Sequence, residues 1–193
     1  MLGLKLASDP RWVNIAAKTI DEILIDHAFC EQKAASSGIS LIVSYPDYEK
    51  VVEEVTAIVA EEWGHFRRVL KELKTRGYKF GQKRKDEYVN ELQKLTKKSD
   101  NRDEILVEKL LIFAMIEARS CERFRLLSLH VADENLQQFY HEFMVSEAEH
   151  YLTFLSLANE YMPVQYVSNR WEEILSGEAE IMKNMVPRGD RVH

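Results

Sequence analysis

Hydrophobic residues recur every three or four positions along almost the whole chain, and polar residues fill the positions between them. This period indicates amphipathic α-helices, because side chains three and four residues apart share one face of a helix. Glycine and proline are scarce, with 7 and 4 among 193 residues, so few positions interrupt the pattern. The pattern predicts four long helices, at about 10–37, 47–76, 103–130 and 134–161. Shorter helices are expected at about 84–98 and from near Ser168 to before Pro187.

Signals at the expected helix ends agree with this division. Asp9 followed by Pro10 is typical of a helix start, and so is the stretch from Tyr45 to Asp47. Gly77 supplies a stop after the second long helix. Four long helices with short accessory helices predict an all-α fold of the four-helix-bundle class. A chain of this length is expected to form a single domain over residues 1–193.

Cysteine usage and the first residues favour a soluble cytoplasmic protein. Cys30 and Cys121 do not form the spaced framework of a disulfide-rich secreted domain, so we expect two reduced thiols in the core. The N-terminal residues lack a basic segment followed by a long apolar run and a cleavage site. No window approaches the ~18 consecutive apolar residues of a membrane-spanning helix. We therefore expect no membrane association.

Positive charge is concentrated in one part of an acidic chain. The formal net charge is -6, which argues against a uniformly basic nucleic-acid binder. Residues 67–85, here called the basic segment, nevertheless carry one acidic residue, Glu72, against nine cations: Arg67, Arg68, Lys71, Lys74, Arg76, Lys79, Lys83, Arg84 and Lys85. This segment is a candidate docking face for a polyanion. The alternative is a solvated helix end, since cations near a helix C-terminus are favoured by the helix dipole.

The pattern Glu-x-x-His occurs twice in the middle of expected long helices, as Glu62 with His65 and as Glu147 with His150. At this spacing both side chains emerge from one helix face, so a single metal ion can bind both. Each pair lies within a hydrophobic stripe, which directs it toward a core, where uncompensated charge is costly. The motif alone is weak, because unrelated helices contain it by chance. Its position in two apolar stripes makes a metal site the better interpretation.

A helical bundle that binds two metal ions needs one further carboxylate from each of the other two long helices. The first helix offers Glu31, whose face neighbours are mostly small or apolar. The third helix offers Glu117 and Glu122, which differ in height from the expected turn near residues 130–134. Glu147 lies about 21 Å from that turn at 1.5 Å per residue. Glu117 matches this height and Glu122 misses it by about 9 Å, so we select Glu117.

The selected ligand set contains four carboxylates and two imidazoles: Glu31, Glu62, His65, Glu117, Glu147 and His150. The lone and paired glutamates are separated by 31 residues in the first half of the chain and by 30 in the second. Mixed carboxylate and imidazole donors suit iron or manganese. Ordinary ion pairs within a bundle are the alternative reading. His27, one turn before Glu31, is either a further metal contact or a core histidine, and we assign no role to His130 and His141.

Six sequence segments around these positions resemble the tRNA 2-methylthio-isopentenyladenosine hydroxylases, the MiaE family. In chain order they are SDPRWV, DHAFCEQKAA, EEWGHF, LKTRGY, IEARSCERF and SEAEHY. The resemblance covers about residues 8–160 and implies a ferritin-like protein with two iron ions, held at all six selected positions. It implies hydroxylation of the isopentenyl group of a modified adenosine beside the tRNA anticodon. Dioxygen would be the co-substrate, and electrons would come from an external donor such as a ferredoxin with its reductase.

With this resemblance the basic segment is expected to bind the phosphates of the anticodon loop, which position a nucleic acid without reading its sequence. Tyr78 and Phe80 either stack on bases or pack on a neighbouring helix. A ferritin-like iron oxidase, peroxidase or storage protein with the same ligands is the main alternative function. A metal-free helical interaction module is the third, and it is disfavoured because we expect few cations inside the protein.

Overall fold

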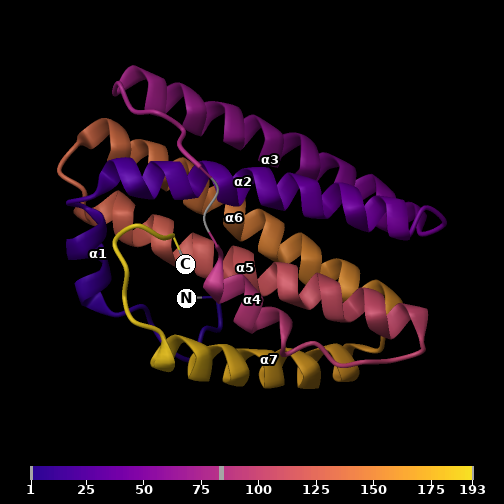
Figure 1. Ribbon diagram of the computed structural model, residues 1–193. Helices are drawn as coiled ribbons and strands as arrows, with labels where there is room; N and C mark the ends of the chain where they lie inside the picture. Colours follow the sequence, from indigo (N-terminus) through magenta and orange to yellow (C-terminus); the bar gives the residue numbers. More distant parts are fainter. Residues whose placement is uncertain (1, 83–84, 193) are drawn as a thin grey trace. The chain divides into compact units, whose positions relative to one another are not determined.

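The computed structural model describes residues 2–82 and 85–192, and within them it contains seven α-helices and no β-strand (Figure 1). The all-α prediction is therefore confirmed. The helices are α1 (Pro10–Ala16), α2 (Ile20–Ser44), α3 (Glu49–Thr75), α4 (Glu87–Gln93), α5 (Arg102–His130), α6 (Glu134–Tyr161) and α7 (Val164–Asn184). The predicted helices at 47–76, 103–130 and 134–161 agree closely with α3, α5 and α6.

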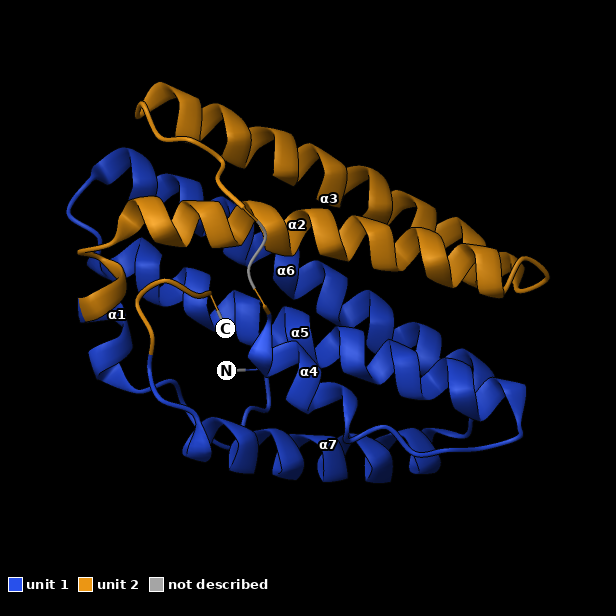
Figure 2. Cartoon of the chain, in the orientation of Figure 1, with its two compact units in different colours: residues 1–14, 86–187, 193 blue, residues 15–85, 188–192 orange. Residues whose placement is uncertain are grey.

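The chain divides into two compact units, which Figure 2 shows in different colours. Unit 1 comprises the residues up to Asn14 together with Asp86–Pro187, and unit 2 comprises Ile15–Lys85 together with Arg188–Val192. Each unit contains one pair of long antiparallel helices joined by a short turn. The pair is α5 with α6 in unit 1 and α2 with α3 in unit 2. The single domain over residues 1–193 stays a prediction.

The predicted helix at 10–37 begins at the correct residue, Pro10, but it is wrong in its continuity and in its C-terminal end. A turn at residues 17–19 separates α1 from α2, with the Lys18 and Thr19 amides donating to the carbonyls of Ile15 and Ala16. The helix α2 then continues through Gly38 to Ser44. Residues 17–19 include neither glycine nor proline. Gly38 lies inside α2, where it allows close packing against α3. A Cβ atom at Gly38 would lie 2.5 Å from Val59 Cγ2 on α3.

This close approach makes Gly38 a position where added volume is costly. We expect Gly38→Ala to lower the free energy of unfolding by about 1–3 kcal/mol, since the new methyl group displaces Val59 in a packed interface. Denaturant unfolding measures the effect. Ser37→Ala is the control, because Ser37 is an exposed neighbour on α2. Wild-type or higher stability of Gly38→Ala would show that the two helices separate without cost.

Side chains cap three of the other helices. Asp86, Asn101 and Asp133 accept hydrogen bonds from backbone amides in the first turns of α4, α5 and α6, respectively. The helix α4 is shorter than the predicted 84–98, because Asp86 starts it and it ends at Gln93. The helix α7 begins at Val164, directly after Pro163, rather than near Ser168. Gly77 has a φ of +76°, which suits its predicted role after α3.

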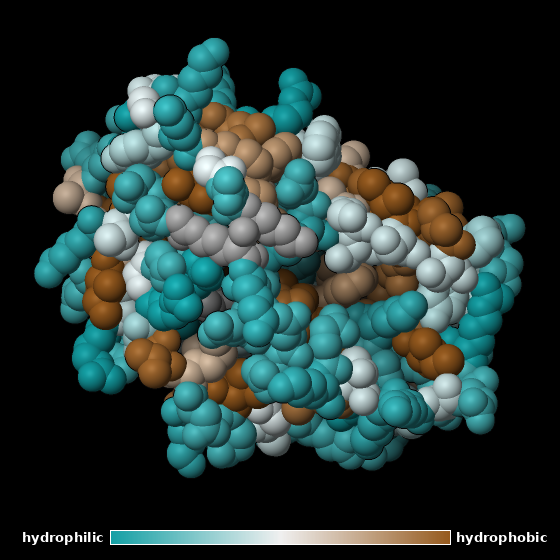
Figure 3. Space-filling model, in the orientation of Figure 1, coloured by the Kyte–Doolittle hydropathy of each residue, from teal (hydrophilic) through white to brown (hydrophobic). Residues whose placement is uncertain are grey.

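The face of the molecule drawn in Figure 3 is mostly hydrophilic, and hydrophobic residues form several separate patches among its polar ones. Single exposed hydrophobic side chains, such as Val43 and Leu152, are normal for a folded protein. Within the part of the chain that the structure describes, no helix has the length and apolar character needed to cross a lipid bilayer.

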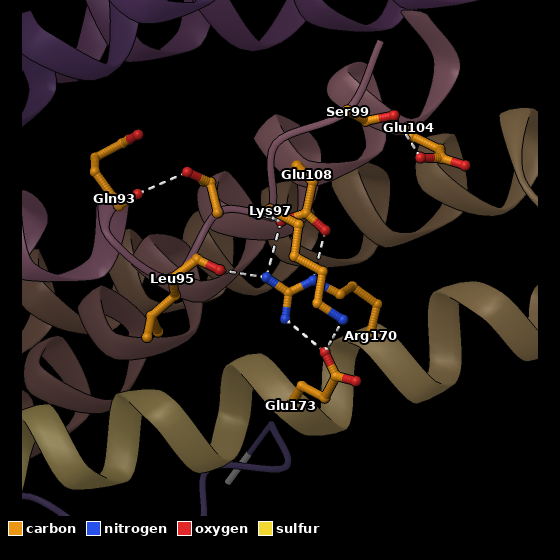
Figure 4. Close-up of polar contacts among 9 residues, drawn as sticks. Gln93, Leu95, Lys97, Ser99, Glu104, Glu108, Arg170 and Glu173 are labelled. Atoms are coloured by element: carbon orange, nitrogen blue, oxygen red, sulfur yellow. Dashed lines mark hydrogen bonds and ion pairs between the residues drawn. The ribbon is translucent and has the colours of Figure 1, made fainter. Parts of the chain in front are cut away.

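Buried arginines attach α7 to the rest of unit 1, as Figure 4 shows for Arg170. Arg170 Nε and Nη2 donate to the Glu108 carboxylate at 2.5 and 2.8 Å, and Nη1 donates to Glu173 at 3.0 Å. Nη2 also donates to the Leu95 carbonyl. These bonds connect α7 with α5 and with the segment after α4. A charge buried this deeply is tolerated only because it is paired and fully hydrogen-bonded.

A second buried network surrounds Arg119 on α5, which has no exposed surface. Its guanidinium bonds to Glu122 and to Glu178 of α7, and it donates to the Leu6 carbonyl at 3.0 Å. Tyr88 on α4 donates to Glu178 at 3.2 Å. The expectation of few cations inside the protein is therefore wrong for unit 1. These arginines, however, pair with glutamates outside the predicted ligand set.

Candidate metal centre

Three of the six predicted metal ligands lie together in unit 2, where we call them the α2–α3 triad. Glu31 is on α2, and Glu62 and His65 are on α3. One donor atom from each lies within 4.8 Å of the others, and the side chains are between 2% and 8% exposed. Buried apolar neighbours on α3, including Ile58 and Phe66, explain why this face turns inward.

The other three predicted ligands lie together in unit 1, where we call them the α5–α6 triad. Glu117 is on α5, and Glu147 and His150 are on α6. Their donor atoms also lie within 4.8 Å of one another, and all three residues are buried. Each unit therefore supplies the same donor set, two carboxylates and one imidazole. The two triads also have nearly the same spacing in the sequence: the lone glutamate precedes the paired glutamate by 31 residues in one and by 30 in the other.

The structure separates Glu122 from this triad. Ser8 donates to the Glu122 carboxylate through its amide at 2.9 Å and through its hydroxyl at 2.6 Å, and Arg119 donates to it as well. Burial raises the pKa of Glu122, but the charge of Arg119 and the bonds from Ser8 outweigh it, so the net pKa lies below the ordinary 4.5. Glu122 is thus an ionised partner of an arginine.

His27 lies next to the α2–α3 triad and contacts one of its carboxylates. His27 Nε2 is 2.6 Å from Glu31 Oε1, and the ring is fully buried. Burial, with a smaller contribution from His65, lowers the pKa of His27 well below 6.5. The tautomer of the neutral imidazole with its proton on Nε2 is assigned from this contact, since the carboxylate oxygen can only accept. Carboxylates that bind metals are commonly held by such a bond, which fixes their orientation.

The donor sets fit divalent transition-metal ions. Carboxylate oxygens and imidazole nitrogens are ligands that iron and manganese accept, and the triads contain no thiolate that would favour zinc. Glu31 Oε2 is buried, accepts no hydrogen bond from the described residues and lies 3.4 Å from His65 Nδ1. A buried carboxylate oxygen in this setting has an open coordination position. The triads are therefore suitable for binding metal ions.

Most of the basic segment is exposed on α3 and just after it. Of its described cations, Arg67, Arg68, Lys71, Lys74, Lys79 and Lys85 are exposed, whereas Arg76 is half-buried and pairs with Glu72 at 2.6 Å. Lys83 and Arg84 lie outside the described residues. An open hollow of about 660 Å³ lies beside α3, lined by Glu61, Gly64, His65, Arg67, Arg68 and Lys71. A metal-ligand candidate and three cations therefore share one surface.

The two aromatic residues in the basic segment have different surroundings. Phe80 stacks on Phe29 of α2 with ring centroids 4.3 Å apart and meets Phe66 of α3 edge-on at 5.7 Å. Phe80 therefore packs between helices, which is the second of the two roles expected for it. Tyr78 is 36% exposed.

Several features of the site and its surroundings have little signal in the sequence. The Arg119 and Arg170 networks depend on α7 and on the first residues of the chain, which are distant in sequence from α5. The bond from His27 to Glu31 follows a spacing of four residues, which permits it without requiring it.

An all-α fold with two buried Glu/Glu/His triads defines the class of ferritin-like helical proteins with candidate carboxylate–histidine metal sites. The fold agrees with a solved structure described as "Protein 43 with aldehyde deformylating oxygenase activity from Synechococcus", with a TM-score of 0.92 and 29% sequence identity. That match covers 98% of this chain and 94% of the other. The family model described as tRNA-(MS2IO6A)-hydroxylase (MiaE) matches residues 3–193, and the chain belongs to this family of enzymes.

Two curated relatives are also named as tRNA hydroxylases. A tRNA 2-(methylsulfanyl)-N(6)-isopentenyladenosine(37) hydroxylase of Pseudomonas putida is 35% identical, and the match covers 90% of this chain and 83% of the relative. A hydroxylase of the same name from Salmonella typhimurium is 26% identical, with 72% of this chain and 67% of the relative covered. The expected family membership, the ferritin-like fold and the enzyme class are confirmed.

Proposed function

We propose that this protein hydroxylates the isopentenyl group of 2-methylthio-isopentenyladenosine in tRNA, with dioxygen as co-substrate and electrons from an external donor. The observation that carries the proposal is the match of the MiaE family to residues 3–193, in a chain whose two Glu-x-x-His pairs are buried. The relatives from Pseudomonas putida and Salmonella typhimurium are named for this modified adenosine.

We propose further that the α2–α3 triad and the α5–α6 triad together hold two iron ions. Their four carboxylates offset the charge of two divalent cations, so the assembled centre buries no net charge. When bound, the iron ions supply the oxygen-activating redox chemistry that amino-acid side chains lack. The chain contributes the ligand geometry, since the hydrogen bond from His27 fixes one oxygen of Glu31 and leaves the other for the metal.

The basic segment is the proposed contact for the anticodon loop. Arg67, Arg68 and Lys71 line the hollow beside α3 together with His65. Phosphates bound at these cations would hold the RNA so that one modified base reaches toward the metal ligands. A storage protein needs no polyanion site at this position, so the arrangement favours the hydroxylase over the ferritin-like iron oxidase.

An electron donor such as a ferredoxin with its reductase is part of the proposal, because each turnover consumes two electrons beyond those from the substrate. The cytoplasm is the proposed location, since tRNA is modified there. Both assignments follow from the proposed reaction.

The masses of the nucleosides in treated tRNA test the proposed function. Reduced, iron-loaded protein is incubated with dioxygen and tRNA that carries the prenylated adenosine, and the tRNA is digested to nucleosides and weighed. The proposal predicts that this nucleoside gains one oxygen atom, whereas tRNA without the prenyl group stays unchanged. Iron oxidation or peroxide consumption that proceeds equally without tRNA, with no oxidised nucleoside, would instead support the iron oxidase.

Reversing two charges in the basic segment should weaken tRNA binding. We expect Lys71→Glu with Lys74→Glu to lower the affinity at low salt and to reduce the slope of log affinity against log salt by about two, since each lost phosphate contact removes roughly one released counterion. Lys98→Glu with Lys183→Glu is a matched control, because it makes the same change in net charge at two exposed lysines of unit 1. Equal losses in both double variants would mean that only the overall charge matters.

A further inference from the structure

Gly64 occupies an unusual position in the middle of α3. Apart from its two chain neighbours and the adjacent backbone of α3 itself, a Cβ atom built there would meet no atom of the described residues within 4 Å. By contrast, a Cβ atom would lie 2.5 Å from Val59 at Gly38 and 2.8 Å from Leu95 at Gly177, the other two glycines inside helices. Packing within the described protein therefore explains those two glycines and leaves Gly64 unexplained. A mid-helix glycine costs about 1 kcal/mol relative to alanine, so an unoccupied space is a poor reason for one.

The surroundings of Gly64 point to a ligand. It lines the hollow beside α3, directly before the metal-ligand candidate His65. Arg68 follows one helical turn later and Lys71 two turns later, and both also line the hollow. Gly64 is therefore adjacent to a proposed iron ligand and lines the same hollow as two cations. Glycine in such a place allows the closest possible approach of a ligand to the backbone.

The chemistry at Gly64 favours a flat apolar contact over an anion. In the middle of an α-helix the backbone amide is already bonded to the carbonyl four residues earlier, so Gly64 has no amide to offer a phosphate. A planar ring can instead lie against the bare helix surface through van der Waals contact. The neighbouring cations Arg68 and Lys71 suit the phosphates on either side of such a ring.

We infer that Gly64 forms the binding surface for the modified purine, which lies flat on α3. The flanking phosphates of the RNA would lie at Arg68 and Lys71, and the N6 substituent of the purine would be directed past His65. This inference rests on the proposed function and assigns the substrate-binding surface of that site. Gly64 acts through its missing side chain: any larger residue lifts the purine away from the helix. The loss should therefore grow with the size of the side chain introduced.

The test measures binding of two stem-loop RNAs that differ only at one position, 2-methylthio-isopentenyladenosine in one and adenosine in the other. Iron-loaded protein is kept without reductant, and affinities come from fluorescence anisotropy. Wild-type protein should prefer the modified loop. Gly64→Leu should reduce this preference at least tenfold, and Gly64→Ala should reduce it to a smaller extent. Lys71→Glu should weaken both loops by a similar factor and leave the preference in place.

Thermal unfolding separates this role from a folding defect. Because space surrounds Gly64 and alanine favours helix, Gly64→Ala should raise the melting temperature by about 2–4 °C while weakening the preference. A variant that is more stable and still discriminates less would be unexplained by a structural role. Wild-type preference retained in Gly64→Leu would overturn this inference alone. A wild-type protein that binds both loops equally would overturn the proposed function, and this inference with it.

Discussion

Replacing Glu117 by alanine is expected to abolish the hydroxylated nucleoside and to lower the iron content from two ions to about one per chain. The α5–α6 triad would keep only Glu147 and His150, and the proposed centre would lose one of the four carboxylates that offset the charge of the metals. Loss of a group that merely orients a ligand typically costs about 10–100-fold, so removing a ligand should reduce turnover by more than about 100-fold. Iron analysis and nucleoside mass measure both effects.

Glu122→Gln is the control for this experiment, because Glu122 lies on the same helix and is also buried. Its carboxylate bonds to Ser8 and Arg119, so its replacement should reduce stability and leave the iron content unchanged. If iron were lost from Glu122→Gln and retained in Glu117→Ala, the choice between the two glutamates would be wrong.

Replacing Arg119 by methionine is expected to give the largest loss of stability among single substitutions outside the triads. The change leaves Glu122 and Glu178 buried without their cation, and breaking a buried ion pair from one side costs about 3–5 kcal/mol. The melting temperature should fall by roughly 10 °C or more. Denaturant and thermal unfolding measure the loss.

Arg125→Met is the matched control on α5, since Arg125 is exposed. It should change the free energy of unfolding by less than about 0.5 kcal/mol. A similarly small effect of Arg119→Met would show that the buried network contributes nothing beyond what methionine replaces. Iron binding by folded Arg119→Met should be normal, because no triad residue bonds to Arg119 in the contacts described above.

The long helices could be predicted because their hydrophobic stripes are continuous and few glycines or prolines interrupt them. The break between α1 and α2 could not, because the residues at 17–19 include no helix breaker and the turn depends on tertiary contacts. One of these joins the Thr19 hydroxyl to the Gly189 carbonyl, 170 residues away in the sequence. The continuation of α2 to Ser44 could not be predicted for a related reason, since the role of Gly38 is set by its contact with Val59 on another helix.

The clustering of the candidate ligands could be predicted because residues three apart share a helix face and residues at equal heights on an antiparallel pair lie side by side. Glu117 lies with Glu147 and His150, as the height comparison with Glu122 required. Arg119 is a possible partner of Glu122 from its spacing of three residues, whereas Ser8 was not accessible, since it lies 114 residues from Glu122 in the sequence. Gly64 gave no signal either, because a glycine with open space and a glycine in a packed interface look alike in sequence.

We propose above that the two triads share one pair of iron ions. The most direct measurement is the position of iron in a crystal of the iron-loaded protein, located by anomalous scattering. We expect two iron ions whose protein ligands are Glu31, Glu62, His65, Glu117, Glu147 and His150. Iron bound at one triad alone, or two triads too far apart to contribute to a common centre, would contradict it.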